Sequence, residues 1–255
     1  MQLEAYARTD LGPVRSNNED SMLVDLENQV FIVADGMGGH AAGEVASSMA
    51  VEVLHGILIR QDEDPDQTRL VRHDDYMERS DELRELLRYG MNQASIQLRQ
   101  HMVKDPATQG MGTTVVVLVF ENDRAHVAHV GDSRAYLCRD GRLLQLTRDH
   151  TVVQMEIDAG RLTPDLAKLV PHKHILTQSV GFHGPVEPDT STRVLQDNDV
   201  FILCSDGLTD VLSDSDIVGI IEANPSDMVA DALVESAIEN GTQDNVTVVA
   251  VFCGD

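Results

Sequence analysis

Carboxylates recur at the ends of apolar, strand-like segments in this 255-residue chain. They stand at five places: Asp35 after residues 30–34, Asp132 after 125–130, Asp206 after 200–204, Asp244 before 246–252, and Glu19 with Asp20 near the start of the chain. One acid in such a place is usually part of a turn or a helix cap. Five places favour a carboxylate cluster, which would repel itself and take up protons unless cations lie within it. Ligands of this kind favour Mg²⁺ or Mn²⁺ over Zn²⁺.

The stretch VADGMGGH at 33–40 allows three interpretations. Residues 36–41 fit the G-x-G-x-x-A pattern of dinucleotide-binding loops, but no second strand-like segment follows until residue 113, so that interpretation is disfavoured. A tight turn would explain the glycines but not the costly carboxylate of Asp35. In a metal loop, Asp35 supplies an oxygen ligand and the glycines let backbone carbonyls approach the ion. The other strand-end acids favour this third interpretation.

The elements that must position these acids do not alternate as β-α-β units. Strand-like segments rich in β-branched residues lie at 30–34, 113–120, 125–130, 134–139, 143–146, 200–204 and 246–252. Helices are predicted at 42–58, from an N-cap at Ser80 onward, and at 226–241, with short ones at 151–159, 164–169 and 214–222. This order predicts an α+β sandwich of antiparallel sheets with helices outside.

Two segments stand apart from this pattern. Residues 60–82 are acidic and poorly periodic, so we predict a solvated loop there. Residues 148–190 interrupt the strands with Gly, Pro and His, and we predict a separate excursion from the sheets.

The formal net charge of −24 disfavours nucleic acids and anionic membranes as partners. No apolar run approaches the ~20 residues of a membrane span, and no N-terminal run resembles a signal peptide, so we expect a cytoplasmic protein. Three widely spaced cysteines, Cys138, Cys204 and Cys253, each lie in an apolar run and are predicted to be buried thiols in a reducing compartment.

Eight short motifs follow one another in an order that is far more specific than any one of them. They are R-x-x-N-E-D at 15–20, DGMGGH at 35–40, GMGTTVV at 110–116, GDSRAY at 131–136, LTRDH at 146–150, LTQSVG at 176–181, SDGLTD at 205–210 and GTQDNVTVV at 241–249. In these motifs the chain resembles the PPM/PP2C family of metal-dependent protein serine/threonine phosphatases, and the DGMGG form resembles its bacterial branch.

The resemblance implies one domain over residues 1–255, a four-layer α-β-β-α sandwich with a flap at about 148–190 beside a metal cleft. It also implies roles for matching residues, with two Mn²⁺ or Mg²⁺ ions and a possible third. Asp35 would bridge two ions with the Gly36 carbonyl as a further ligand, Asp206 and Asp244 would hold the first ion, Glu19 would act on the second, and Asp132 with Asp206 would form the third site. Arg15 would grip the substrate phosphate, with Asp20 and Asn245 in support.

The implied activity is hydrolysis of phosphoserine and phosphothreonine by a hydroxide that bridges the metal ions. Two such ions can acidify a water, orient it and offset phosphoryl charge, while Arg15 adds a bidentate clamp. The implied partners are phosphorylated proteins and a bacterial Ser/Thr kinase that the enzyme opposes, and we expect a monomer. The alternative is a catalytically weak scaffold relative that binds a signalling partner; such relatives would be expected to lose metal acids, which are present here.

The chain departs from the family pattern at two points. Met37 stands where many relatives carry a histidine that is proposed to protonate the leaving oxygen. His40 is then a candidate general acid, a helix cap is its other interpretation, and a metal-bound water is a third candidate donor. In the flap, Lys173-His174 stand where members often carry Arg-Asn, and without a partner cluster in the sequence we interpret His172 and His174 as surface residues.

Overall fold

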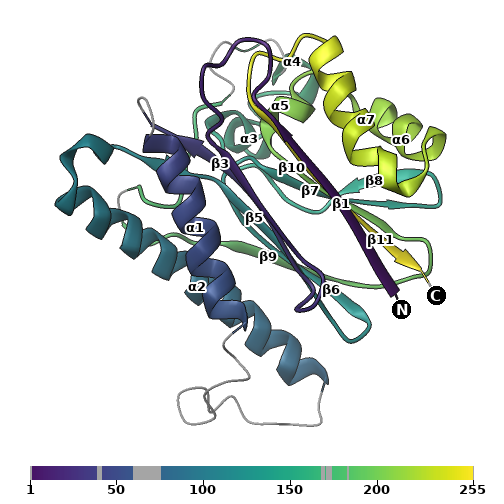
Figure 1. Cartoon of the computed structure of the whole chain (residues 1–255), viewed down its shortest axis with the longest axis horizontal. Helices are drawn as coiled ribbons and strands as arrows, with labels where there is room; N and C mark the ends of the chain where they lie inside the picture. The colour runs from purple at the N-terminus through teal and green to yellow at the C-terminus, as the bar shows by residue number, and fades with distance from the viewer. Residues whose placement is uncertain are drawn as a thin grey trace.

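Two antiparallel sheets packed face to face form the centre of the molecule (Figure 1). The computed structural model describes residues 2–38, 42–59, 76–167, 170, 174–182 and 184–254. The first sheet has the order β1-β11-β10-β7-β8 and the second the order β2-β3-β5-β6-β9, with β4 paired to β3. The strands are β1 (Gln2–Asp10), β2 (Asp20–Asp25), β3 (Val30–Met37), β4 (Gly112–Thr113), β5 (Val115–Glu121), β6 (Arg124–Val130), β7 (Arg134–Arg139), β8 (Arg142–Gln145), β9 (Asp189–Val194), β10 (Val200–Cys204) and β11 (Val246–Gly254).

Helices cover both outer faces of this pair of sheets. The helices are α1 (Ala42–Ile59), α2 (Tyr76–Lys104), η2 (Pro106–Thr108), α3 (Val152–Asp158), α4 (Pro164–Ala167), α5 (Asp206–Thr209), α6 (Asp214–Ala223) and α7 (Ser226–Glu239). The long pair α1 and α2 packs on the second sheet, and α5, α6 and α7 pack on the first. The predicted four-layer α-β-β-α sandwich is therefore confirmed.

Strands in the middle of the sandwich are buried on both faces, which explains their unbroken apolar sequences. On β5, Val117 points to the layer under α1 and α2, whereas Val116 points between the sheets. Phe120 bridges the two sheets, because its ring lies edge-on to Phe31 at 5.8 Å and to Phe201 at 5.3 Å between centroids. Such strands carry no polar face, so they read as continuous hydrophobic runs rather than alternating ones.

Helix α1 illustrates why composition alone is weak evidence for a membrane-spanning helix. By length and hydropathy it could cross a membrane, but its buried residues pack against β3 and α2 as part of a protein core. The three cysteines are buried and free, as the sequence predicted.

The structure differs from the sequence prediction at several elements. Strands β1, β2 and β9 were not predicted; each is an edge strand of its sheet and carries several polar residues. Helix α2 begins at Tyr76, so Ser80 lies inside the helix and is not its N-cap, and residues 76–82 are helical rather than part of a loop. Residues 60–75 of the predicted acidic loop lie outside the described residues.

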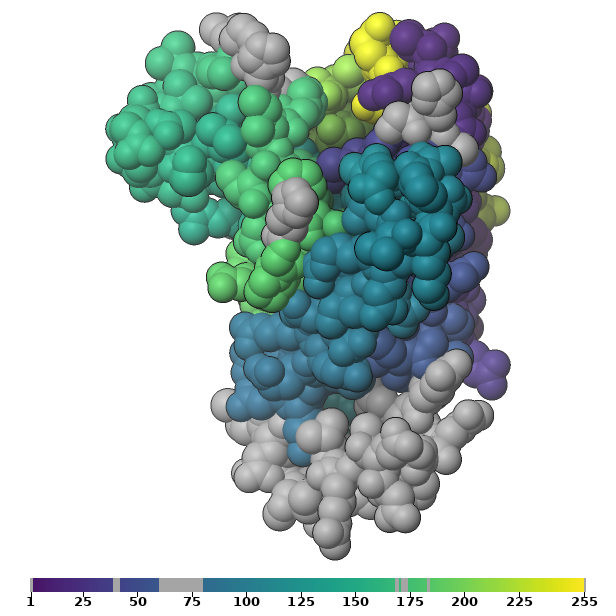
Figure 2. All heavy atoms as spheres, turned by 90° about the vertical axis from the view of Figure 1, so that its left-hand side faces the viewer, coloured from purple at the N-terminus to yellow at the C-terminus, as the bar shows by residue number. Residues whose placement is uncertain are grey.

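The described residues between β8 and β9 form no strand of either sheet. In Figure 2 the first part of this segment, in green, forms a lobe that projects from the upper end of the molecule. Its base is tied down by a Thr151–Leu176 bridge, a Thr113–Val180 bridge and an ion pair between Arg134 and Asp149 at 2.6 Å. These contacts anchor the segment beside the strand ends that carry the acids.

Candidate metal centre

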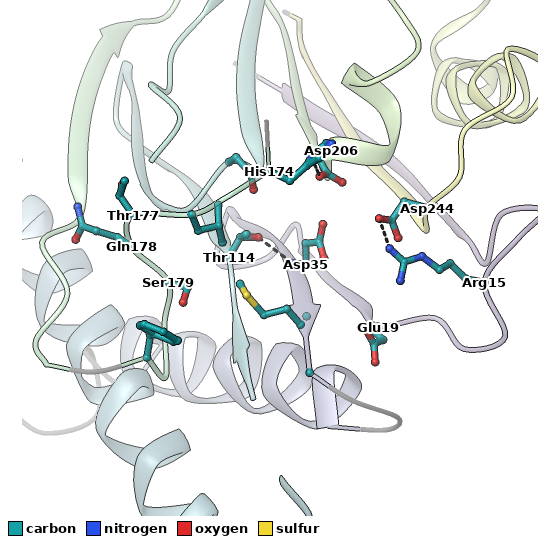
Figure 3. A pocket seen from close by; sticks show the side chains of 16 residues that line it. Arg15, Glu19, Asp35, Thr114, His174, Thr177, Gln178, Ser179, Asp206 and Asp244 are labelled. Carbon is teal, nitrogen blue, oxygen red and sulfur yellow. Dashed lines mark hydrogen bonds and ion pairs between the residues drawn. The ribbon is translucent and has the colours of Figure 1, made fainter. Parts of the chain in front are cut away.

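The strand-end acids meet in one pocket of about 390 Å³ (Figure 3). Of the predicted site residues, those that line it are Arg15, Glu19, Asp35, Gly36, Asp132, Asp206 and Asp244. The acids lie at or near the ends of strands of both sheets, and Arg15 lies in the loop between β1 and β2. The structure thus brings the predicted ligand set together, and the assignment of each residue to an ion stays a prediction.

Asp35 stands at the end of β3, where two threonines hold its backbone. Its N–H donates to the Thr114 hydroxyl at 3.0 Å, and its carbonyl accepts from the Thr113 hydroxyl at 2.9 Å and from the Thr114 N–H at 2.8 Å. The backbone being fixed, the carboxylate projects into the pocket. No role was predicted for these threonines, although they lie in the motif GMGTTVV.

Asp20 lies behind the pocket and joins the two sheets. It pairs in register with Asp35 on the second sheet. Its Oδ2 accepts hydrogen bonds from Ser205 at 2.8 Å and from Thr247 at 2.7 Å, both of which belong to the first sheet or its end. A buried carboxylate that bonds across the sandwich therefore sets how the two groups of strand ends meet.

Asn245 performs a similar task for the N-terminal loop. Its Oδ1 accepts from the Glu19 backbone N–H at 2.9 Å, and its Nδ2 donates to the carbonyls of Leu11 at 2.8 Å and Asn17 at 3.1 Å. These three bonds hold the loop that carries Arg15 and Glu19 against the start of β11. The supporting role of Asn245 at the metal site stays a prediction.

Glu19 points toward the start of helix α1. An added Cβ on Gly43, in the first turn, would lie 2.7 Å from the Glu19 carboxyl carbon, so only glycine leaves room for this side chain. The N-terminal end of a helix favours a carboxylate, because its free N–H groups carry partial positive charge.

Asp132 and Asp206 approach each other from two different strand ends, and the structure adds His174 to them. The three side chains offer ligand atoms that all lie within 4.8 Å of one another. His174 Nδ1 lies 3.1 Å from Asp206 Oδ2, and its Nε2 lies 3.4 Å from Asp210 Oδ2. His174 is exposed, as predicted, but it lies over the acids, and Asp132 and Asp206 form the partner cluster that the sequence did not show. The sequence signal was its place in the flap, two residues before the start of the LTQSVG motif.

Arg15 is already engaged in the pocket, since its Nη2 donates to Asp244 Oδ2 at 2.6 Å. Its side chain remains 49% exposed, so the guanidinium stands at the mouth of the pocket rather than inside it. Met37 also lines the pocket, next to the acids. His40 lies outside the described residues, as does His172.

Burial and mutual repulsion raise the pKa of several of these carboxyl groups. Burial is the main cause for Asp35, whose pKa lies well above its usual value, and the charges of Asp20, Asp206 and Asp132 add to the shift. The pKa rises to about 7 for Asp20 and for Asp132, in each case chiefly through burial and then through Asp206. Protons therefore occupy part of the cluster at neutral pH unless cations replace them.

A buried oxygen with no partner indicates that a cation fits here. Among the described residues Asp206 Oδ1 is buried and accepts no hydrogen bond, although its Oδ2 contacts His174. An unpaired buried carboxylate oxygen is costly, and a metal ion would satisfy it. Oxygen ligands with one imidazole suit Mn²⁺ well.

Gly207 allows the strand ends of Asp206 and Asp244 to meet, and its replacement tests this packing. An added Cβ would lie 2.0 Å from the Asn245 carbonyl oxygen, so Gly207→Ala should displace this segment and weaken Mn²⁺ binding by roughly tenfold or more. Gly219→Ala is the matched control, because nothing lies within 4 Å of its added Cβ and alanine favours the helix. Isothermal titration with Mn²⁺ measures both, and equal affinities would contradict the packing argument.

The raised carboxyl pKa values predict how pH affects the metal-free protein. Unfolded aspartates titrate near ~3.9, whereas Asp20 and Asp132 titrate at about 7 when folded, so folding takes up protons. Their stabilising contribution is complete below pH ~4 and is lost as pH rises through 7. With EDTA, the melting temperature should fall from pH 6 to pH 8, and Mn²⁺ should raise it more at pH 8. Thermal melts at both pH values check this. If Mn²⁺ raised the melting temperature equally at pH 6 and pH 8, the prediction would be contradicted.

Comparison with known proteins agrees with this geometry. The family described as protein phosphatase 2C matches residues 14–233. The chain is 38% identical over 247 residues to the serine/threonine protein phosphatase PstP of Mycobacterium tuberculosis, covering 97% of this chain but only 44% of PstP. It is 37% identical over 211 residues to the serine/threonine phosphatase Stp of Listeria welshimeri, covering 82% of this chain and 79% of that one.

Solved structures give the same result. The crystal structure of M. tuberculosis PstP superposes with a TM-score of 0.84 at 36% identity, covering 100% of both chains. The PstP catalytic domain in complex with two manganese ions superposes with a TM-score of 0.81 at 36% identity, covering 99% of both. The matches span the sandwich and the acid-lined pocket together, and the chain belongs to the protein phosphatase 2C family.

Proposed function

We propose that this protein is a Mn²⁺- or Mg²⁺-dependent phosphatase that hydrolyses phosphoserine and phosphothreonine in proteins. The observation that carries the proposal is the convergence of Glu19, Asp35, Asp206 and Asp244 in one pocket with Arg15 at its mouth. Relatives named serine/threonine phosphatases, and a relative's structure with two manganese ions, support it. A scaffold role is less well supported, because no metal-ligating acid of the predicted set is missing.

The residues for two ions are those predicted from the sequence. Asp35 would contact both ions, with the Gly36 carbonyl as a further ligand. Asp206 and Asp244 would hold the first ion, and Glu19 would act on the second. When bound, the ions supply a water acidic enough to act as the nucleophile and positive charge for the phosphoryl oxygens.

The protein's own side chains position and complete this site. Arg15 can turn from Asp244 to the substrate phosphate, since a guanidinium binds phosphate in a bidentate manner and an ion would take over the charge of Asp244. Thr113 and Thr114 fix the backbone of Asp35, so its carboxylate need not reorganise during the reaction. His40 stays a candidate proton donor for the leaving oxygen, beside a water of the metal centre.

The partners follow from charge and chemistry. A net charge of −24 favours phosphoproteins with basic residues near the phosphorylated side chain, and a cognate Ser/Thr kinase would make them. Three buried free thiols support a reducing, cytoplasmic location. We propose a monomer of one domain, with residues 148–190 as a flap beside the pocket.

Phosphate release tests the activity directly. With Mn²⁺ the protein should hydrolyse p-nitrophenyl phosphate and a phosphothreonine peptide, and EDTA should abolish both reactions. Asp206→Ala removes a predicted ligand and should lower kcat by roughly 10²-fold or more, whereas Asp227→Ala, on the exposed first turn of α7, should not. Activity that survives EDTA would contradict the metal mechanism, and wild-type protein inactive with Mn²⁺ would favour the scaffold alternative.

His174 provides a separate test of a third ion beside Asp132 and Asp206. Its Nδ1 lies 3.1 Å from Asp206, so His174→Ala should weaken the weakest of the Mn²⁺ sites by about tenfold and leave the other two unchanged. His101→Ala, in the last turn of α2, is the control. Electron paramagnetic resonance of bound Mn²⁺ at increasing concentrations measures the sites, and an unchanged weakest site would exclude His174 as a ligand.

A further inference from the structure

A second groove lies at the other end of the sandwich and has the opposite electrostatic character. It has a volume of about 480 Å³ and is lined by Leu137, Arg139, Asp140, Arg142, Leu144 and Arg193. These residues come from the β7–β8 hairpin of the first sheet and from β9 of the second (Figure 1). Three arginines thus gather around one groove of a chain with a net charge of −24.

Sheet register explains why these side chains face one another. On the β7–β8 hairpin, Leu137 pairs with Leu144 and Arg139 pairs with Arg142, so all four share one face. Leu137 belongs to the cluster between the sheets, so that face points toward the second sheet. Arg193 pairs with Ala125, which belongs to the same cluster. The groove is therefore the open edge of the space between the two sheets.

The arginines of this groove differ in how their charges are compensated. Arg139 donates two hydrogen bonds to the buried Asp199, both at 2.6 Å, so its charge is compensated and its side chain is held in place. Arg193 donates only to the Thr192 carbonyl, at 2.9 Å, and within the described chain neither Arg193 nor Arg142 has a carboxylate within 4.0 Å. Asp140 is the single acid in the lining. Two guanidinium groups are consequently available for an external anion.

The backbone at this edge is available as well. Strand β8 ends the first sheet and β9 ends the second, so within the described chain each has one edge without a neighbouring strand. Leu144 on β8 is 50% exposed and Val194 on β9 is 51% exposed. An uncovered edge with exposed apolar side chains is able to accept an added strand.

We propose that this groove binds an acidic, extended segment of a partner protein, which pairs with the free edge of β8. Arg142 and Leu144 are two residues apart on β8, so both side chains lie on the inward face. The bound segment should therefore present a carboxylate and an apolar side chain that are also two residues apart. The carboxylate would lie between Arg142 on one sheet and Arg193 on the other. The apolar side chain would cover Leu144.

This site is separate from the metal centre. Asp132 lies just before the first residue of β7, and Arg139 is its last, so the six residues of β7 place the groove roughly 20 Å from the acids. Binding there should leave the chemistry unchanged and raise the local concentration of a tethered phosphorylated side chain. This chain has a net charge of −24, so most of its surface should repel an acidic partner, whereas the arginines of the groove should attract one.

Fluorescence anisotropy tests the proposal without any reliance on phosphatase activity. The probe is a fluorescein-labelled peptide of Thr-Glu-Thr-Leu repeats, titrated in EDTA with the whole chain. Arg142→Glu with Arg193→Glu should weaken binding by roughly tenfold or more, because both cations become anions. A Thr-Lys-Thr-Leu peptide should not bind, and binding of the acidic peptide should weaken several-fold from 50 to 300 mM salt.

Matched variants separate the groove from general electrostatics. Arg84→Glu with Arg88→Glu makes the same charge change on the surface of α2 and should leave peptide affinity unchanged. The neutral pair Arg142→Gln with Arg193→Gln should weaken binding to an intermediate degree, and it serves if the charge reversal impairs folding. Equal losses in the α2 and groove variants, or no loss in either groove variant, would overturn the proposal. Hydrolysis of p-nitrophenyl phosphate with Mn²⁺ should remain unchanged in all of them.

Discussion

Repulsion among buried carboxylates is the interaction on which the rest of this structure depends. Asp20 and Asp35 stand in register on adjacent strands, and Asp132, Asp206 and Asp244 approach them from other strand ends. Without cations such a cluster takes up protons, and the raised pKa values of Asp20 and Asp132 express this. Two rigid sheets are needed to hold the charges together, because loops alone would let them separate.

The segments that carry the acids must also lie very close to one another, and three glycines leave the space for this. An added Cβ at Gly36 would lie 2.1 Å from the Gly43 carbonyl oxygen, and one at Gly207 would lie 2.0 Å from the Asn245 carbonyl oxygen. At Gly43 the space is taken by the Glu19 carboxylate instead. Gly36 of the DGMGG motif and Gly207 of the SDG motif therefore act through the space they leave, which is a different use from the phosphate-binding turns that the glycine spacing resembles.

The sequence predicted the layers and the acids well, because both depend on local patterns. Apolar runs mark the strands that are buried on both faces, and acids at their ends mark the edge where they meet. The hydrogen bonds from Ser205 and Thr247 to Asp20 could not be predicted from the sequence. Their partners are separated by 185 and 227 positions along the chain and meet only because the two sheets pack together. Strand β9 was missed because its residues are polar, and the contact of His174 with Asp206 was missed because it joins residues that are far apart in the sequence.

The acid-lined pocket and the arginine-lined groove lie at opposite ends of the sandwich, and each follows from how the strands finish there. At one end, strands of both sheets finish in acids, and the space between the sheets is closed by Asp20 and its hydroxyl partners. At the other end, the edge strands β8 and β9 leave that space open, and an apolar opening would expose Leu137 and Leu144 to water. Arginines suit this place because their stems cover apolar surface while their guanidinium groups stay hydrated. The arginine-lined groove thus follows from the open space between β8 and β9, and the charges of Arg142 and Arg193 there can bind an acidic partner.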